Sequence, residues 1–309
     1  MALLHCEINS KAIRMVTSVC VILPHDAGGS SGGGLTDIHT YQDSLIQATD
    51  AHGENGRPAA TDIPGGTAQL TGTGSPNGTG RPAAVRTAEE PVKTLYLLHG
   101  RSHNYSVWTR YTNLERYAED HGIAVIMPEV NRSFYTDMRY GVNYQTYISE
   151  ELPDLCESMF RISRNPEDRF IAGMSMGGYG AVKTALSHPD RYAACGLLSA
   201  VTDIRQHIAD TPEGNPKRQE FQGIFGTGLT VSPGDDIYHL AQKCALLPKK
   251  PDFYLACGTE DHLYQETVRF RDFLQTLPYR LTYDEWEGIH DWVFWDEGIK
   301  RMLNCFFPV

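Results

Sequence analysis

The feature that most constrains this chain is the pentapeptide Gly-Met-Ser-Met-Gly at residues 173–177. A short apolar run precedes it at residues 170–172, and a helix-forming stretch follows at residues 179–186. A G-x-S-x-G pattern between a strand and a helix is typical of a nucleophile elbow. The glycines let a strained turn pass close to its neighbours, so that the central hydroxyl stands open above the sheet. Ser175 is therefore the predicted nucleophile.

Short apolar runs alternate with stretches of helical periodicity along the rest of the chain. Strands are predicted at residues 17–24 (an early antiparallel strand), 92–98, 123–128, 169–174, 194–199, 252–257 and 280–286. Helices are predicted after the elbow and at residues 109–121, 144–160 (bent or restarted at Pro153), 264–277 and 292–306. Buried strands that alternate with helices predict a doubly wound α/β fold with a mostly parallel sheet.

Two segments interrupt this alternation. Residues 25–90 are rich in glycine, serine, threonine and proline, and Gly-Arg-Pro-Ala-Ala at residues 56–60 recurs at residues 80–84. Such a composition buries too little apolar surface to offset chain entropy, so we predict a disordered insertion in a single domain spanning residues 1–309. Residues 201–247 are polar and turn-rich, and they predict a cap or substrate-binding excursion at the carboxyl edge of the sheet.

Composition excludes several classes of partner. The formal net charge is −11 without a cluster of basic residues, which disfavours nucleic acid and anionic membrane surfaces. No stretch reaches the roughly 18 apolar residues of a membrane span, and the N-terminus lacks the pattern of a signal peptide, so a cytoplasmic protein is expected. The seven cysteines form no C-x-x-C pair and are predicted to be reduced core thiols. Because H-E-x-x-H is also missing, we expect neither a metal nor a cofactor.

A serine hydroxyl needs a base to take its proton, and the base needs a carboxylate to hold its tautomer. In folds with this elbow the chain order is serine, acid, histidine. His290 follows the last predicted strand and precedes the last helix, and Asp261 follows the strand before it. We prefer Asp261 to its neighbour Glu260 because its shorter side chain suits a loop end. The alternatives are an incidental loop histidine at 290 and a helix N-cap at 261.

Two backbone amides are expected to face the developing oxyanion. One is the amide of Met176, next to the nucleophile, and the other is that of Arg101, in the loop after residues 92–98. Gly100 permits a close turn there and is counted with the substrate-binding residues; the alternative is an ordinary glycine turn. Aromatic residues near the same edge could line a pocket or belong to the core, namely Trp108, Phe134, Tyr135, Trp292 and Trp295.

Four motifs in chain order resemble the esterase D-like branch of the α/β-hydrolases, and within it the bacterial tributyrin esterases. They are Leu-Leu-His-Gly at 97–100, the stretch 173–181, Cys-Gly-Thr-Glu-Asp at 257–261 and Gly-Ile-His-Asp-Trp at 288–292. The sequence of residues 133–138 is most similar to that of the tributyrin esterases. The resemblance implies an eight-stranded α/β-hydrolase sheet, hydrolysis of short-chain esters, a Ser175–His290–Asp261 triad and oxyanion donors at Arg101 and Met176.

The expected function is that of a serine carboxylesterase that acts on small-molecule esters. For the assembly, both a monomer and a homo-oligomer are alternatives. Alternatives that keep the serine are a feruloyl or acetyl-carbohydrate esterase, an S-formylglutathione-type thioesterase and an acyltransferase. The S-formylglutathione hydrolases tend to carry a cysteine in the loop where this chain has Arg-Ser-His at residues 101–103, which favours ordinary esters. An alternative of another class is a binding protein on a hydrolase scaffold.

Overall fold

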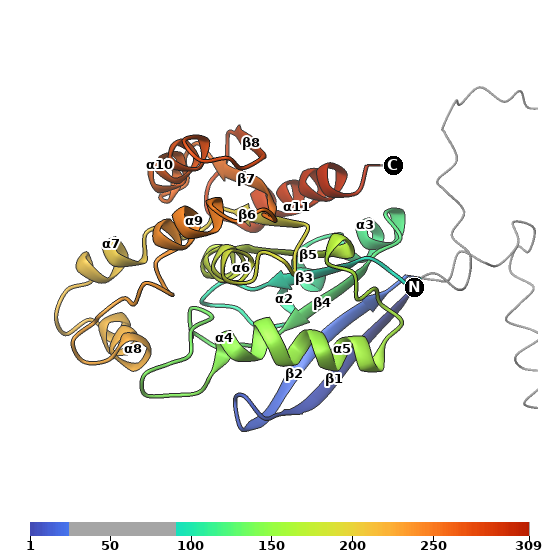
Figure 1. Cartoon of the computed structure of the whole chain (residues 1–309), viewed down its shortest axis with the longest axis horizontal. Coiled ribbons are helices and arrows are strands. Elements are labelled where there is room, and N and C mark those ends of the chain that lie inside the picture. Colours follow the sequence, from blue (N-terminus) through green and yellow to red (C-terminus); the bar gives the residue numbers. More distant parts are fainter. Residues whose placement is uncertain (25–90, 309) are drawn as a thin grey trace, which may run out of the picture. The chain divides into compact units, whose positions relative to one another are not determined.

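In the computed structural model, which describes residues 1–24 and 91–308, eight strands form one sheet in the order β1-β2-β4-β3-β5-β6-β7-β8 (Figure 1). Neighbours pair in parallel from β4 to β8, whereas the β1–β2 and β2–β4 pairs are antiparallel. The strands are β1 (Ala2–Ser10), β2 (Met15–Leu23), β3 (Thr94–Leu98), β4 (Ala124–Pro128), β5 (Arg169–Met174), β6 (Ala194–Leu198), β7 (Asp252–Gly258) and β8 (Leu281–Trp286). The predicted mostly parallel, eight-stranded sheet is confirmed. The predicted insertion at residues 25–90 lies outside the described residues.

Helices cover both faces of the sheet, and each face has its own apolar core (Figure 1). One core contains side chains from α5 (Leu152–Met159), α6 (Met176–Ser187), α9 (Ile237–Ala245) and α10 (Tyr264–Gln275). The other contains side chains from α2 (Val107–Tyr111), α3 (Leu114–Asp120) and α11 (Trp292–Phe306). Because both faces are covered, every residue of the central strands β3, β4, β5 and β6 is buried. This explains why these strands read as continuous apolar runs.

Two predicted helices differ from the structure. Residues 109–121 form two helices, because the chain is extended at Thr112 and the Asp296 carboxylate accepts a hydrogen bond from the amide of Asn113 (2.9 Å). Residues 144–160 divide into α4 (Tyr144–Thr146), a π-helical turn (Tyr147–Glu151) and α5, with Pro153 in the first turn of α5. Proline has no amide hydrogen to continue the helical ladder, and the hydrogen-bonding pattern changes next to it, while the backbone stays helical at the joins between the three parts.

The turn-rich stretch 201–247 contains three helices among the described residues: α7 (Ile204–Ala209), α8 (Pro216–Phe225) and α9. Their buried side chains include Ile208, Phe221 and Leu240, which join the core on the α6 face. The segment is therefore packed onto the domain, while its predicted role as a cap stays a prediction. Among the helices that the structure describes, none combines the length and apolar character needed to cross a bilayer.

The predicted set of core thiols is only partly correct. All seven cysteines are free, and five of them are buried. Cys6 is half-buried and Cys305 is exposed. Cys305 lies on the last helix, where it faces outward near Thr282.

Candidate active site

The turn between β5 and α6 holds Ser175 in a strained backbone conformation. Its φ is 55° and its ψ is −121°, a region that costs a non-glycine residue about 1–3 kcal/mol. The Ser175 amide donates to the carbonyl oxygens of Leu198 (3.0 Å) and Ser199 (3.1 Å) at the end of β6. These hydrogen bonds hold the turn in place, and they leave the hydroxyl at the carboxyl edge of the sheet.

The glycines of the pentapeptide are required by close packing. A Cβ atom on Gly173 would lie 2.4 Å from the carbonyl carbon and oxygen of Gly177. A Cβ atom on Gly177 would lie 2.4 Å from the carbonyl oxygen of Leu98 in β3. Both contacts are with backbone, which cannot move aside as a flexible side chain could. The pattern therefore arises from how tightly β3, β5 and α6 approach one another around the serine.

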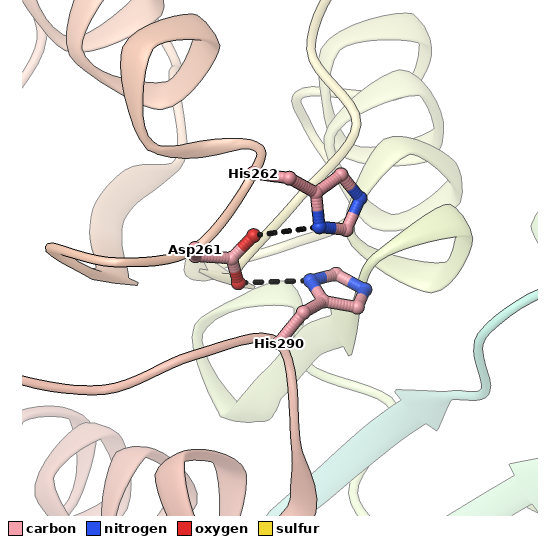
Figure 2. Close-up of side chains that lie close together, drawn as sticks. All are labelled: Asp261, His262 and His290. Atoms are coloured by element: carbon pink, nitrogen blue, oxygen red, sulfur yellow. Dashed lines mark hydrogen bonds and ion pairs between the residues drawn. The ribbon is translucent and has the colours of Figure 1, made fainter.

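A chain of hydrogen bonds connects three side chains that are far apart in the sequence. His290 Nε2 lies 3.1 Å from Ser175 Oγ, and His290 Nδ1 lies 2.8 Å from Asp261 Oδ2. Asp261 follows β7 and His290 lies between β8 and α11, so both come from loops at the edge where Ser175 stands. Figure 2 shows the Asp261 carboxylate turned toward the His290 ring. The structure thus brings the three predicted residues together.

Asp261 is a buried carboxylate whose two oxygens both have donors. Its side chain is 0% exposed; Oδ2 faces His290, and Oδ1 accepts from the amide of Leu263 (2.8 Å). Burial alone would raise the pKa of this carboxyl group, but the hydrogen bonds from His290 and the Leu263 amide outweigh it and lower the pKa below 3.8. Asp261 is therefore ionised at neutral pH. An ionised carboxylate only accepts hydrogen bonds, so it favours the His290 tautomer with a proton on Nδ1 and leaves Nε2 free to accept.

Two rings border His290. Trp295 packs against it nearly perpendicularly, with ring centroids 4.9 Å apart, and His262 lies 4.6 Å away on another side. Trp295 is itself buried, so its ring gives a fixed wall that restricts how the imidazole turns. Only 21% of the His290 side chain is exposed. The imidazole is therefore held in the orientation that aims Nε2 at Ser175.

The two predicted oxyanion donors lie beside the serine hydroxyl and in the loop after β3. Met176 is the first residue of α6, and neither its amide nor that of Arg101 has a hydrogen-bond acceptor among the described residues. Free amides at the start of a helix favour a negative charge. Gly100 makes the loop compact, because a Cβ atom there would lie 2.8 Å from Met174 Sδ. The role of both amides as oxyanion donors stays a prediction.

The side chain of Arg101 connects this loop to α8. Its Nε and Nη2 donate to Glu220 Oε2 at 2.9 and 2.5 Å, while Arg132 Nη1 donates to Glu220 Oε1 at 2.9 Å. Lys217, one turn earlier on α8, has a pKa lowered by burial and by the nearby Arg101 charge. Two arginines therefore pair with one carboxylate, and Lys217 adds a third basic side chain beside the loop of residues 99–104, called the oxyanion loop from here on.

Two of the predicted pocket residues, Trp108 and Trp292, form an aromatic group behind the oxyanion loop. Trp108 is fully buried and its Nε1 donates to the carbonyl oxygen of Leu98 (3.2 Å). Trp292 is half-buried and packs edge-on against Trp108 (5.4 Å) and face-on against Tyr111 (5.0 Å). Trp292 has surface left for a ligand, whereas Trp108 supports the loop from beneath. Contact with substrate stays a prediction for both.

Two more of the predicted pocket residues, Phe134 and Tyr135, lie between the oxyanion loop and α8. Both have positive φ values, 48° and 54°, and both are buried. The Tyr135 hydroxyl donates to the carbonyl oxygen of His99 (2.9 Å), and Phe134 packs against Phe221 of α8 with centroids 5.4 Å apart. Their shared role in this structure is to brace the loop against α8, and substrate contact again stays a prediction.

Sequence reasoning missed two neighbours of the site. Glu220, which pairs with Arg101, lies in a stretch with no regular pattern, and nothing in the sequence signals its partner. His262 adjoins Asp261 and does not fit the chain order serine, acid, histidine, yet its Nδ1 lies 3.4 Å from Asp261 Oδ1. The one signal in the sequence was that His262 directly follows Asp261. That position does not predict the direction of the His262 side chain.

Comparisons with known proteins agree with this geometry. Residues 78–306 match a family described as "Putative esterase". The chain is 33% identical over 226 residues to an acetyl esterase of Caldicellulosiruptor saccharolyticus, a match that covers 70% of this chain and 83% of that protein. FphF, a fluorophosphonate-binding serine hydrolase of Staphylococcus aureus with substrate bound, is 30% identical with a TM-score of 0.74, covering 100% of this chain and 99% of that one. The S-formylglutathione hydrolase FrmB of the same species is 29% identical with a TM-score of 0.71, covering 99% of both chains.

The family match spans most of the chain, and the solved structures share its sheet and flanking helices. The predicted α/β-hydrolase fold is confirmed, and so is the prediction of an enzyme over that of a binding protein on a hydrolase scaffold. The chain therefore belongs to the Esterase family, and it is a serine esterase of small-molecule substrates.

Proposed function

We propose that this enzyme is a carboxylesterase that hydrolyses short-chain acyl esters through an acyl-enzyme on Ser175. The observation that carries the proposal is the unbroken chain of hydrogen bonds from Ser175 Oγ through His290 to Asp261. A serine hydroxyl becomes a useful nucleophile only when a base of fixed tautomer can take its proton. His290 has both requirements, an Nε2 beside the hydroxyl and a buried carboxylate at Nδ1.

In the first half of the reaction, Ser175 Oγ attacks the carbonyl carbon while its proton passes to His290 Nε2. The negative charge that forms on the carbonyl oxygen is stabilised by the amides of Arg101 and Met176, and Asp261 stabilises the imidazolium. When the tetrahedral intermediate collapses, the bond to the alcohol oxygen breaks and the alcohol leaves with the proton from His290. Water then attacks the acyl-enzyme by the same steps in reverse and releases the acid.

The similarity to an acetyl esterase, which is 33% identical to this chain, supports a short acyl group in the substrate. The tributyrin esterase subgroup, named by resemblance, is consistent with the same substrate class. The feruloyl and acetyl-carbohydrate alternatives differ in the alcohol or in a bulkier acyl group. A series of p-nitrophenyl esters from acetate to octanoate, assayed beside methyl ferulate and acetylated xylan, separates these classes. Highest kcat/KM for acetate or butyrate supports the proposal, and highest kcat/KM for ferulate contradicts it.

A second candidate is a thioesterase of the S-formylglutathione type. It is favoured by Arg101, Arg132 and Lys217, which make the surface beside the oxyanion loop suitable for an anionic leaving group such as glutathione. Assays with S-formylglutathione and p-nitrophenyl acetate at low and high salt distinguish the two. Recognition by these exposed or half-buried charges weakens as salt rises. A high kcat/KM for the thioester that falls with salt, beside an ester rate that does not, supports the thioesterase.

The first prediction concerns Ser175 itself. Ser175→Ala removes the nucleophile and is expected to lower kcat on p-nitrophenyl acetate by roughly 10⁴–10⁶-fold. A fluorophosphonate probe should label the wild type and leave this variant unlabelled. Ser158→Ala is the matched control, because Ser158 is an exposed serine on α5. Substantial turnover or labelling in Ser175→Ala would exclude this serine as the nucleophile.

A further inference from the structure

A third side chain lies against the Asp261–His290 pair, and the proposed reaction does not use it. His262 Nδ1 lies 3.4 Å from Asp261 Oδ1, while His290 Nδ1 lies 2.8 Å from Asp261 Oδ2. The carboxylate therefore faces one imidazole with each oxygen, and the two rings are 4.6 Å apart (Figure 2). His262 is 66% exposed, so the cluster is open to solvent on its side.

The atoms of this cluster are of the kind that a borderline divalent cation prefers. One nitrogen from each histidine and one carboxylate oxygen all lie within 4.8 Å of one another. Zn²⁺ takes imidazole nitrogen and carboxylate oxygen at about 2.0–2.2 Å and accepts a water molecule as its fourth ligand. Ligand atoms at these distances from a tetrahedral ion lie roughly 3.3 Å apart, so the side chains have to move toward one another when the ion binds. The open side at His262 gives the cation an entry path and leaves room for the water.

The protonation state of the cluster also suits a metal. An ordinary histidine side chain is mostly neutral near pH 7 and so has a lone pair for a metal ion. Asp261 is ionised at the same pH. Binding of the cation through His290 Nδ1 requires that the hydrogen bond between this nitrogen and Asp261 Oδ2 is given up.

We propose that Asp261, His262 and His290 form a binding site for Zn²⁺ that inhibits the esterase reversibly. The inhibitory part rests on the proposed role of His290 as the base. A neutral imidazole that binds a metal through Nδ1 carries its proton on Nε2. The ring keeps one proton, and that proton moves from Nδ1 to the nitrogen that faces Ser175. His290 then has no lone pair with which to accept the serine proton, so acyl transfer stops while the metal stays bound.

Binding is tested without reference to turnover. Isothermal titration of Zn²⁺ into Ser175→Ala is compared with titration into Ser175→Ala/His262→Gln, both carrying Cys305→Ser so that the exposed thiol does not bind the metal. Loss of His262 is expected to weaken Zn²⁺ binding by at least about 10–100-fold, the effect that loss of even an outer partner of a metal site brings. His239→Gln in the same background removes an exposed imidazole on α9 and should leave binding unchanged. Equal binding with and without His262 would overturn the proposal.

Inhibition is tested on the active enzyme. With Ser175 intact and Cys305→Ser in each variant, residual activity on p-nitrophenyl acetate is measured against Zn²⁺ concentration and expressed relative to each variant's own metal-free rate. The concentration for half inhibition should rise at least about 10-fold in His262→Gln, and excess EDTA should restore the original rate. Metal binding at His262 without inhibition would overturn the inhibitory site. Failure of the proposed function is separate, because it would appear as turnover in Ser175→Ala, which the titration does not measure.

Discussion

Asp261 is a buried carboxylate that is ionised in the folded protein. The free energy of unfolding therefore depends on the pH. Its pKa is lowered below 3.8 in the folded protein because hydrogen bonds from His290 and the Leu263 amide outweigh burial. In the unfolded chain these donors are lost and the carboxyl group returns to its ordinary value. The folded state therefore binds a proton at this residue less readily than the unfolded state. The carboxylate stabilises the fold above the ordinary pKa, and that contribution disappears as the pH falls through the lowered value.

Comparison of the wild type with Asp261→Asn tests this coupling. The difference between their free energies of unfolding should shrink as the pH falls below about 4, where Asp261 becomes protonated first in the unfolded chain and then in the folded protein. Urea denaturation at several pH values, in EDTA to remove bound metal, gives both curves. Only the change of the difference with pH is used, so any constant cost of the amide cancels. A difference that stays level down to pH 3 would contradict the lowered pKa.

At the scale of an element, α6 begins directly after Ser175 and is buried from Met176 to Leu186. One of those buried residues is Lys183, whose Nζ donates to Asp235 Oδ1 (3.0 Å) and Thr136 Oγ1 (2.7 Å). Burial lowers the pKa of Lys183, and the Asp235 carboxylate opposes that shift. The pair connects α6 to two loops that pack over it, so it helps to fix the helix that begins directly after Ser175.

Lys183→Met is expected to lower the free energy of unfolding by about 3 kcal/mol, because Asp235 loses its charged partner while it stays largely buried and keeps the hydrogen bond from Ser232 Oγ. This is the lower end of the effect of breaking a buried pair, since 18% of the Asp235 side chain is still exposed. Urea denaturation at pH 7 measures the loss. Lys249→Met removes a lysine that is 65% exposed from its pair with Glu167, and the unfolding midpoint should stay the same. A loss in Lys183→Met as small as in this control would show that the buried pair contributes little.

At the scale of the whole molecule, the sheet could be predicted because its central strands are buried on both faces and read as apolar runs. The limits of β5 agree at both ends with the prediction for residues 169–174, and α11 agrees with residues 292–306. The division of residues 109–121 into α2 and α3 could not be predicted. It depends on Asp296, which is 183 residues away from Asn113 in the sequence and meets it only in the folded chain.

The same distinction applies to the candidate site. Ser175, Asp261 and His290 were predictable as a set because each follows a strand, and the ends of parallel strands meet at one edge of the sheet. The Arg101–Glu220 pair was not predictable, because α8 lies in a segment without a periodic pattern. Nor was the His262–His290 contact, which depends on how two loop ends turn toward one carboxylate. Contacts that follow from the order of strands and loops along the chain can be predicted from the sequence. Contacts that depend on the direction in which a loop turns can be found only in the structure.

The described part of the chain indicates how residues 25–90 could be replaced. β2 ends beside the start of β4, since Ile22 pairs with Val125, and β3 begins beside the same point, since Thr94 pairs with Ala124. The end of β2 and the start of β3 are therefore two strand spacings apart, roughly 10 Å. A few residues span that distance, because an extended chain covers about 3.3 Å per residue. The sheet does not need a long connection at this place.

We therefore expect that a chain in which an eight-residue glycine-serine linker replaces residues 25–90 folds and keeps its esterase activity. The parts of the sheet, the cores and the candidate site that the structure describes are built from residues outside the replaced segment. We therefore expect kcat/KM on p-nitrophenyl acetate to stay within about threefold and the urea midpoint not to fall. A longer loop costs only slightly more closure entropy, which is why the predicted gain in stability from shortening it is small. A chain that fails to fold, or one that folds and loses most of its activity, would show that residues 25–90 contribute to the domain or to its site and are not a dispensable insertion.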